Sequence, residues 1–380
     1  MKKIKVVFLH NQLVCGGAEQ ALFDLISLMD KSKFDIRILT MVEGGEWESK
    51  FQNAGIPIIS LFVRRRRGWA PVYFFRHQLR KLKINYMLRC SPEKLVPSLY
   101  PEGIDVLVSY SIWEFDRMGF AENARSIKFI HGDVASNQPF RDSILRIRHL
   151  LPEYDSIVCV SQQAYQSFCE ITGISENVQM HFNPLNSANV SVLAKEEVVL
   201  PEGMPVICAV GRLAKEKGYD RLIRIHRNIL DLGIAHRLVI VGDGPEREHL
   251  IQVIRETGTQ DSVIMTGYQS NPYPYMRKSD FLVCSSYTEG LPVIAMECLS
   301  LGIPIVSALP SIGEAFGDEV CGLVTENDDD SLQEGIRKML EDKEFYCQVK
   351  ESAVRQSRYF DGNRMVREIE ELLWPNEFTE

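Results

Sequence analysis

The stretch DFLVCSSYTEGLPVIAMECLSLGIPIVS, residues 280–307, contains one complete strand–loop–helix–strand unit. The apolar run 281–284 ends at a Ser-Ser-Tyr-Thr turn, which is typical of a short buried strand. Apolar residues then recur at helical spacing over 293–299, Gly302 ends that helix, and a second apolar run follows. Because parallel strands are joined by crossover helices, this order predicts an α/β fold with a parallel sheet.

Two carboxylates occupy unusual places in this unit. Glu289 lies in the loop at the carboxyl end of a predicted strand, where open α/β sheets bind ligands. Glu297 lies on an otherwise apolar helix, where a charge needs a partner or a cleft. The helix start between them offers free N–H groups to a phosphate, and carboxylates suit hydroxyls, so the combination describes a nucleotide-sugar. The alternative is that Glu289 is a helix-start acid and Glu297 a partly exposed helix residue.

Length and composition describe an ordinary globular protein. The chain has 380 residues, 45% of them hydrophobic and 25% charged, which predicts two domains. The net charge of −8 gives no support to global nucleic-acid binding. The nine cysteines lack CxxC or Cys/His metal spacing, so we interpret them as free thiols in a reducing cytosol. Because the sequence shows neither a signal peptide nor a membrane-spanning apolar run, we expect a cytoplasmic protein.

The first half of the chain alternates strands with helices. A helix is predicted over about residues 18–29, and strands are predicted at 4–9, 36–41, 56–61, 105–109, 127–130 and 156–160. Gly16 and Gly17 precede that helix and let the backbone approach a ligand closely, although a tight turn explains the pair equally well. His131 follows a strand in FIHGD, where it can meet a ligand, although a lone histidine is more often structural.

A basic segment interrupts this half of the chain: residues 50–92 contain no Asp or Glu. Its predicted helix has one apolar face, made by Val72, Phe75, Leu79, Leu82 and Tyr86. A cationic amphipathic helix with aromatics suits an anionic membrane surface, where each basic side chain contributes up to ~1 kcal/mol. The residues expected at that surface are Arg64, Arg65, Arg66, Arg67, Trp69, Arg76, Arg80 and Lys83. The alternatives are a solvated basic face on an ordinary packed helix and, third, an RNA contact.

A second α/β series follows the polar, turn-rich stretch 186–203, which is the predicted linker. Arg212 and Lys217 come after its first strand and bring two cations to the carboxyl edge of the sheet, which suits a diphosphate. Gly242 lies in the next turn, where glycine permits close backbone approach. Either cation alone would be interpreted as a solvated surface charge. Both together, in front of the two carboxylates, favour a binding site.

Five motifs together resemble the retaining nucleotide-sugar glycosyltransferases of family 4, also called glycosyltransferases group 1. They are GGAE at 16–19, HGD at 131–133, GRLAKEKG at 211–218, VGDGP at 241–245 and EGLPVIAMECLSLGIPIVS at 289–307. Family members have two carboxylates separated by seven residues, as Glu289 and Glu297 are. The resemblance spans most of the chain and is densest over 206–308.

The resemblance implies a GT-B fold, in which two Rossmann-like domains face each other across a cleft. We expect an N-terminal acceptor domain over residues 1–185, the linker 186–203 and a nucleotide-sugar donor domain over 204–360. The final helix, within 361–380, is expected to cross back to the N-terminal domain. An apolar stripe over 366–373 fits that role.

The same resemblance implies how a donor is held. Arg212 and Lys217 hold the diphosphate, Glu297 binds the ribose hydroxyls, and Glu289 holds the sugar. Gly17 closes over the phosphate. The implied catalytic residues are His131, Arg212, Lys217 and Glu289, of which His131 touches the transferred sugar. The implied donor-binding set is Gly16, Gly17, Arg212, Lys217, Gly242, Gly267, Tyr268, Glu289, Gly290, Leu291, Pro292 and Glu297. Many members have a glycine–aromatic pair between Gly290 and Pro292; the shorter EGLP form here leaves the donor sugar open.

The resemblance further implies a front-side mechanism in which the departing phosphate takes the acceptor proton, with neither metal nor cofactor. The leading hypothesis is transfer of a hexose-type sugar from a UDP-sugar to a lipid-linked saccharide of a surface polysaccharide. The protein would then lie peripherally on the inner face of the cell membrane. The alternatives are a soluble acceptor, a nucleotide-sugar epimerase and a non-catalytic GT-B partner subunit. A nicotinamide dehydrogenase fits least, because no GxGxxG opens either half.

Overall fold

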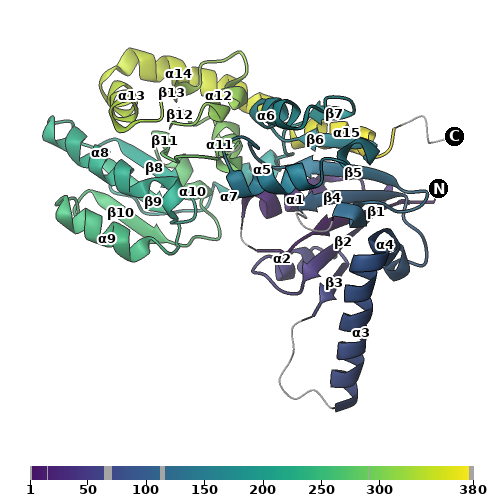
Figure 1. Cartoon of the computed structure of the whole chain (residues 1–380). Helices are drawn as coiled ribbons and strands as arrows, with labels where there is room; N and C mark the ends of the chain where they lie inside the picture. The colour runs from purple at the N-terminus through teal and green to yellow at the C-terminus, as the bar shows by residue number, and fades with distance from the viewer. Residues whose placement is uncertain (1, 15, 64–70, 112–115, 290, 376–380) are drawn as a thin grey trace. The chain divides into compact units, whose positions relative to one another are not determined.

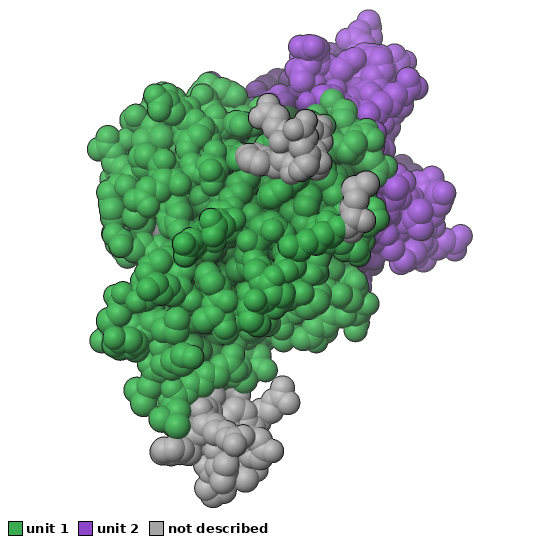
Figure 2. Space-filling model, turned by 90° about the vertical axis from the view of Figure 1, so that its right-hand side faces the viewer, with its two compact units in different colours: residues 1–184, 363–380 green, residues 185–362 purple. Residues whose placement is uncertain are grey.

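The computed structural model of the chain describes residues 2–14, 16–63, 71–111, 116–289 and 291–375, without the side chains of 71–77 and 116. The chain divides into two compact units (Figure 1). Unit 1 contains residues 1–184 and 363–380, and unit 2 contains residues 185–362, as coloured in Figure 2. Each unit is built on a parallel sheet, which confirms the predicted α/β class.

Among the described residues, the sheet of unit 1 has seven strands in the order β3-β2-β1-β4-β5-β6-β7. Their bounds are β1 Ile4–His10, β2 Phe34–Val42, β3 Ile58–Phe62, β4 Val106–Ser111, β5 Arg125–Ile130, β6 Ser156–Cys159 and β7 Val178–Met180. The strand order reverses between β1 and β4. The carboxyl ends of these two strands therefore form the switch point at which open α/β sheets bind ligands.

The sheet of unit 2 repeats this topology, with six strands in the described residues and the order β10-β9-β8-β11-β12-β13. Their bounds are β8 Val206–Val210, β9 Arg237–Val241, β10 Val263–Gly267, β11 Phe281–Cys284, β12 Ile305–Ser307 and β13 Gly322–Val324. The switch point lies between β8 and β11. The loops after these strands carry Lys217 and Glu289, respectively.

Helices connect the strands and flank the sheets (Figure 1). Those of unit 1 are α1 Gly17–Leu28, α2 Glu48–Asn53, α3 Pro71–Cys90, α4 Pro92–Leu99, α5 Gln138–Arg146 and α6 Gln162–Thr172. Those of unit 2 are α7 Ser187–Leu193, α8 Tyr219–Asp231, α9 Arg247–Glu256, α10 Tyr273–Arg277, α11 Val293–Ser300, α12 Ser311–Phe316, α13 Asp329–Glu341 and α14 Lys343–Gln356. The last helix, α15 Gly362–Leu373, follows unit 2 in sequence.

The apolar stripe of α15 packs into the core of unit 1. Four residues of this stripe are buried in the cluster that contains Val6 and Phe8 of β1 and Leu22 of α1. These four are Val366, Ile369, Leu372 and Leu373. Arg125 at the start of β5 also donates a hydrogen bond to the carbonyl of Leu372, at 3.2 Å. Burial of apolar surface therefore attaches the end of the chain to the sheet formed by its beginning.

The stretch predicted as a linker, 186–203, contains helix α7. This helix contacts α10 and α11 and so packs as part of unit 2. Its N-terminus is capped by the side chain of Asn186, whose oxygen accepts from the backbone N–H of Asn189 at 3.1 Å. The sequence pattern also did not indicate β7 and β13, because a three-residue strand is too short to show a period of two.

Helix α3 differs from an ordinary packed helix. Its described apolar residues on the predicted face, Leu79, Leu82 and Tyr86, are 50%, 64% and 68% exposed. The side that packs on unit 1 is instead made by Ile84, Met87 and Leu88. Arg64, Arg65, Arg66, Arg67 and Trp69 lie outside the described residues, as does the side chain of Arg76. In the described part of the chain, no helix is long and apolar enough to cross a membrane.

Candidate functional site

The switch point of unit 2 brings together two residues that the sequence singled out. Nζ of Lys217 lies 2.5 Å from Oε2 of Glu289, and the hydroxyl of Ser286 donates to the other carboxylate oxygen. The two side chains of the ion pair are only 22% and 19% exposed. A cation and a carboxylate 72 positions apart therefore share one partly buried place at the edge of the sheet.

Close backbone approach fixes the geometry of this pair. Gly218, between Lys217 and α8, has a φ of +62°, and a Cβ atom there would collide with the carbonyl oxygen of Ser285. The hydroxyl of Ser285 donates to the carbonyl of Lys217 at 2.9 Å. The N–H of Tyr287 donates to the carbonyl of Glu216 at 2.8 Å. The loops after β8 and β11 are thus joined by hydrogen bonds on both sides of the ion pair.

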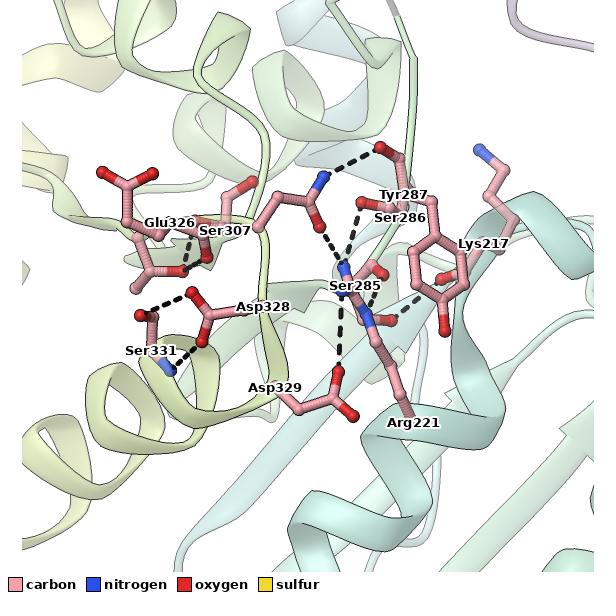
Figure 3. Close-up of polar contacts among 12 residues, drawn as sticks. Lys217, Arg221, Ser285, Ser286, Tyr287, Ser307, Glu326, Asp328, Asp329 and Ser331 are labelled. Atoms are coloured by element: carbon pink, nitrogen blue, oxygen red, sulfur yellow. Dashed lines mark hydrogen bonds and ion pairs between the residues drawn. The ribbon is translucent and has the colours of Figure 1, made fainter.

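The buried side chain of Arg221 donates hydrogen bonds to the loop after β11 (Figure 3). Arg221 of α8 is 3% exposed, and its Nε donates to the carbonyl of Ser285 at 2.8 Å. Its Nη2 donates to the carbonyl of Ser286 at 3.1 Å and to Oδ1 of Asn327 at 2.8 Å. The guanidinium lies 4.2 Å from the centre of the Tyr287 ring. No motif marked Arg221; the available signal was a charge beside the apolar residues of α8.

Arg212, the second predicted cation, lies further toward solvent. Its side chain is 67% exposed, and its guanidinium pairs with Glu216 at 3.1 Å. Exposed pairs of this kind typically contribute about 1 kcal/mol or less. A diphosphate can therefore recruit Arg212 at small cost, whereas Lys217 must be taken from Glu289.

Glu297 is buried on α11, as its apolar neighbours predict. Its Oε1 accepts a hydrogen bond from the hydroxyl of Tyr273 on α10, at 2.7 Å. Both residues are almost completely buried. The charge on this apolar helix has thus found a donor on a neighbouring helix. The sequence did not indicate Tyr273, because a tyrosine in a proline-rich turn carries no motif of its own.

The remaining predicted donor residues of unit 2 lie in loops around these pairs. A Cβ atom at Gly242 would collide with the carbonyl of Gly211, so this glycine permits the loops after β8 and β9 to pack together. Gly267 ends β10 with a φ of +74°, and Tyr268 after it is exposed. Leu291 is buried and Pro292 precedes α11, whose first turn has no side-chain cap. Gly290 lies outside the described residues.

Unit 1 places Gly16 and Gly17 at the start of α1. Gly16 has an extended conformation and offers no side chain to cap the first turn. The backbone N–H groups there, at the positive end of a 12-residue helix, suit an anion. Glu19 in this turn has its pKa raised to about 7, chiefly by burial. Its Oε1 lies 3.6 Å from Nε2 of His10, whose pKa burial lowers to about 4.

His131 follows β5 beside this turn. Its ring centre lies 4.3 Å from that of Tyr110, the penultimate residue of β4. Both ring nitrogens are buried and have no hydrogen-bond partner of good geometry among the described residues. Burial and, next, the nearby His10 lower the pKa of His131 to about 3. The imidazole is therefore neutral at pH 7 and can exchange a hydrogen bond with a hydroxyl without carrying charge.

Within the described part of the chain, no group of three or more His, Cys, Asp or Glu is arranged to hold a metal ion. The cysteines that the structure describes are all free. Among the predicted donor-binding residues that the structure describes, the cations available to an anionic ligand are Arg212 and Lys217.

Comparisons with known proteins agree with this geometry. Residues 193–356, which contain Lys217, Glu289 and Glu297, match the family Glycosyl transferases group 1. The matched segment lies within unit 2 and is similar to this family. The match includes the whole switch point of unit 2, so the resemblance predicted from the motifs is confirmed.

Two curated relatives of the chain have named roles. One is the N-acetylgalactosamine-N,N'-diacetylbacillosaminyl-diphospho-undecaprenol 4-alpha-N-acetylgalactosaminyltransferase of Campylobacter jejuni, 30% identical over 224 residues. The match covers 58% of this chain and 60% of that enzyme. The other is the lipopolysaccharide core biosynthesis glycosyltransferase LpsD of Rhizobium meliloti, 29% identical over 189 residues, or 49% of this chain and 54% of LpsD. In both cases the matched segment spans less than two thirds of the relative.

Solved structures extend the likeness to the fold of the whole chain. Anabaena HepE in complex with UDP superposes with a TM-score of 0.73 at 17% identity, covering 97% of this chain and 99% of HepE. WaaG, a glycosyltransferase involved in lipopolysaccharide biosynthesis, superposes with a TM-score of 0.66 at 15% identity. The superposition covers 98% of this chain and 100% of WaaG. The predicted GT-B fold is thereby confirmed.

Proposed function

We propose that this protein transfers a hexose-type sugar from a UDP-sugar to a hydroxyl group of a lipid-linked saccharide. The observation that carries the proposal is the placement of Lys217 and Glu289 at the switch point of unit 2. A diphosphate needs a cation there, and a sugar needs a hydrogen-bond acceptor within reach of the same phosphate. Buried Glu297 supplies a further carboxylate on the helix that begins at this loop, suited to ribose hydroxyls.

The proposed reaction proceeds with retention and without a metal or cofactor. The acceptor oxygen bonds to the anomeric carbon from the side that the leaving group vacates, while the bond from that carbon to the phosphate oxygen breaks. The acceptor proton passes to the departing phosphate. Lys217, Arg212 and the uncapped start of α11 stabilise the charge on the diphosphate, which is the role a metal ion would otherwise have. Neutral His131 offers a hydrogen bond to the transferred sugar.

The substrates that we propose follow from one solved structure and two relatives. UDP is bound in the structure of HepE, which supports a UDP-sugar here. The name of the Campylobacter relative contains a diphospho-undecaprenol saccharide, and LpsD acts in lipopolysaccharide core biosynthesis. These names support a lipid-linked acceptor over a free sugar, and with it a role in the biosynthesis of a surface polysaccharide.

Helix α3 supports a membrane-bound acceptor. Its exposed Leu79, Leu82 and Tyr86 lie on a helix that also exposes Arg80 and Lys83. Apolar side chains beside cations suit the interface of an anionic membrane. In Figure 1, α3 extends away from the sheet of unit 1, and Leu79, Leu82 and Tyr86 are all at least half exposed. We therefore propose that the protein lies peripherally on the cytoplasmic face of the cell membrane.

A thermal-shift panel tests the donor first. The panel contains UDP, GDP, ADP and their sugar conjugates. A nucleotide that binds and is present at a hundred times its dissociation constant adds about 2.7 kcal/mol to the folding stability. We expect stabilisation by UDP and UDP-sugars alone. The matching radiolabelled sugar is then offered to an undecaprenyl-diphosphate saccharide and to the same saccharide without lipid, with EDTA present. Transfer to the lipid-linked acceptor with an unchanged anomeric configuration supports the proposal; stabilisation without transfer to either acceptor contradicts it.

A further inference from the structure

The hydrogen bond between Tyr273 and Glu297 joins two buried residues from different helices. The hydroxyl of Tyr273 lies 2.7 Å from Oε1 of Glu297, and each residue is 6% exposed. Tyr273 begins α10, which follows the loop after β10, whereas Glu297 lies in the second turn of α11. The contact therefore connects two loop-and-helix segments on the same sheet.

This contact helps to orient the carboxylate of Glu297. The other buried residues of α11 are Ala295, Met296, Cys298 and Leu299, none of which carries a strong donor. A hydroxyl that donates to a carboxylate makes a short, charge-assisted bond with a defined geometry. The bond from Tyr273 therefore fixes the position of Oε1 relative to α10.

Tyr273 is itself held firmly. Its backbone N–H donates to Oδ1 of Asn271 at 3.3 Å, and Nδ2 of Asn271 donates to the carbonyl of Leu193 in α7 at 3.0 Å. Helix α7 contacts both α10 and α11, and Met276 of α10 is completely buried. The phenol ring therefore has little freedom to follow a displaced carboxylate.

We propose that Tyr273 is a positioning residue that orients Glu297 toward the ribose hydroxyls of the donor nucleotide. This inference rests on the proposed function, because it requires a nucleoside diphosphate in unit 2. A tyrosine that merely fills space would contribute to folding and to every ligand equally. An orienting tyrosine contributes only where the ligand presents a hydroxyl to Glu297.

The test removes one oxygen from the protein and one from the ligand. Dissociation constants for UDP, 2′-deoxy-UDP and 3′-deoxy-UDP are measured by calorimetry with the parent and with Tyr273→Phe. We expect the parent to prefer UDP over at least one deoxy analogue by about tenfold, the effect of one good hydrogen bond. In Tyr273→Phe, UDP should bind about tenfold more weakly while that deoxy analogue binds as before, so the discrimination is lost.

Two further variants provide the control and the alternative. Tyr275→Phe makes the same change two positions away on α10 and should preserve the discrimination. Glu297→Gln should abolish it, and adding Tyr273→Phe to Glu297→Gln should cause no further loss. Discrimination that persists in a folded Tyr273→Phe protein, or equal weakening of all three ligands, overturns the role of Tyr273 alone. A folded parent that does not bind UDP overturns the proposed function and the inference with it. A parent that binds UDP but does not discriminate the ribose overturns the inference alone.

Discussion

Lys217 and Glu289 form an ion pair, with Nζ and Oε2 2.5 Å apart, although the proposed donor needs the two groups for different purposes. The diphosphate attracts Lys217, whereas the sugar hydroxyls suit Glu289. Donor binding therefore exchanges one intramolecular ion pair for two separate ligand contacts. The carboxylate acts as a competitor of the phosphate until the sugar engages it.

This exchange predicts that Glu289→Gln binds UDP more tightly than the parent. The amide no longer neutralises Lys217, so the diphosphate does not have to displace a charged partner. A partly buried pair worth about 1 kcal/mol corresponds to an approximately fivefold lower dissociation constant. Sugar transfer should fall at the same time, because the acceptor of sugar hydrogen bonds is weakened. Calorimetry with UDP and a transfer assay measure the two effects.

Glu216→Gln is the matched control for this prediction. Glu216 pairs with Arg212 at the surface, where the pairing energy is small, and the variant should change UDP affinity by less than about twofold. Weaker binding of UDP by Glu289→Gln would contradict the competition and would instead make Glu289 a direct ligand of the nucleotide.

Arg221→Met should destabilise the protein because three oxygens lose their donor. These are the carbonyls of Ser285 and Ser286 and Oδ1 of Asn327. The two carbonyls belong to buried serines, and a buried acceptor without a partner costs about 1–3 kcal/mol, whereas Asn327 is exposed and can bind water instead. We therefore expect a loss of about 2–4 kcal/mol in the free energy of unfolding. Urea unfolding measures this loss. Sugar transfer should fall as well, since the same loop presents Glu289.

Arg224→Met provides the control, because Arg224 is exposed on the same helix. It should change the free energy of unfolding by less than about 0.5 kcal/mol. An Arg221→Met protein as stable as Arg224→Met would show that the hydrogen bonds in Figure 3 contribute nothing net.

The sequence alone was sufficient to predict the strands and helices around the site and to identify several of the site residues. The strand at 281–284, the helix after it and the loop between them follow from apolar spacing, proline and glycine, which act locally. Lys217 and Glu289 were found because the residue types in the loops after two strands suit a phosphate and a sugar. Their direct pairing, across 72 positions, was not predictable from either loop.

Arg221 and Tyr273 show what a single sequence does not reveal. Arg221 contacts Ser285 and Asn327, which lie 64 and 106 positions away, so its role depends on how three loops meet. Tyr273 matters because α10 brings it to Glu297, 24 positions later. The apolar spacing of α3 indicated a helix correctly. The spacing did not tell which side of α3 would pack, because Ile84 joins a cluster that contains residues of β1 and β2, which are distant in sequence.

The exposed residues of α3 predict binding to anionic vesicles. Leu79→Ser with Leu82→Ser should lower the partition coefficient onto vesicles of phosphatidylglycerol and phosphatidylethanolamine at least fivefold, since two exposed apolar side chains are lost. Thermal stability should stay within about 0.5 kcal/mol, because neither side chain belongs to a core. Cosedimentation measures the partition.

Arg80→Gln with Lys83→Gln separates charge from apolar contact. At ~1 kcal/mol per cation, binding should fall by over tenfold on anionic vesicles and remain unchanged on neutral ones. Leu232→Ser, at an exposed leucine of unit 2, serves as the control and should bind like the parent. Equal binding by all variants would leave α3 as an ordinary solvated helix.

Two buried histidines of unit 2 form a directed chain of hydrogen bonds. Nδ1 of His236 lies 2.9 Å from the carbonyl of Ile234 and must donate to it, so Nε2 of His236 accepts. That acceptor lies 2.7 Å from Nδ1 of His226, which therefore carries a hydrogen. Nε2 of His226 lies 2.8 Å from the hydroxyl oxygen of Ser262, and this hydroxyl also donates to the carbonyl of Thr259 at 3.2 Å. Because both rings are buried, a positive charge on either of them is disfavoured.

This arrangement predicts that acid destabilises the protein through His226 and His236. Burial lowers the pKa of His226 to about 3 and that of His236 below its ordinary value of 6.5. Below pH 6.5 the unfolded chain binds more protons than the folded one, so stability that is complete above pH 6.5 is lost as the pH falls. His226→Gln should cost about 1–3 kcal/mol at pH 7.5, and this difference should shrink at pH 5 because the variant has lost a titrating group. Urea unfolding at both pH values measures the two differences, with exposed His249→Gln as the control. A difference from the parent that is the same at both pH values would show that His226 does not couple folding to protons.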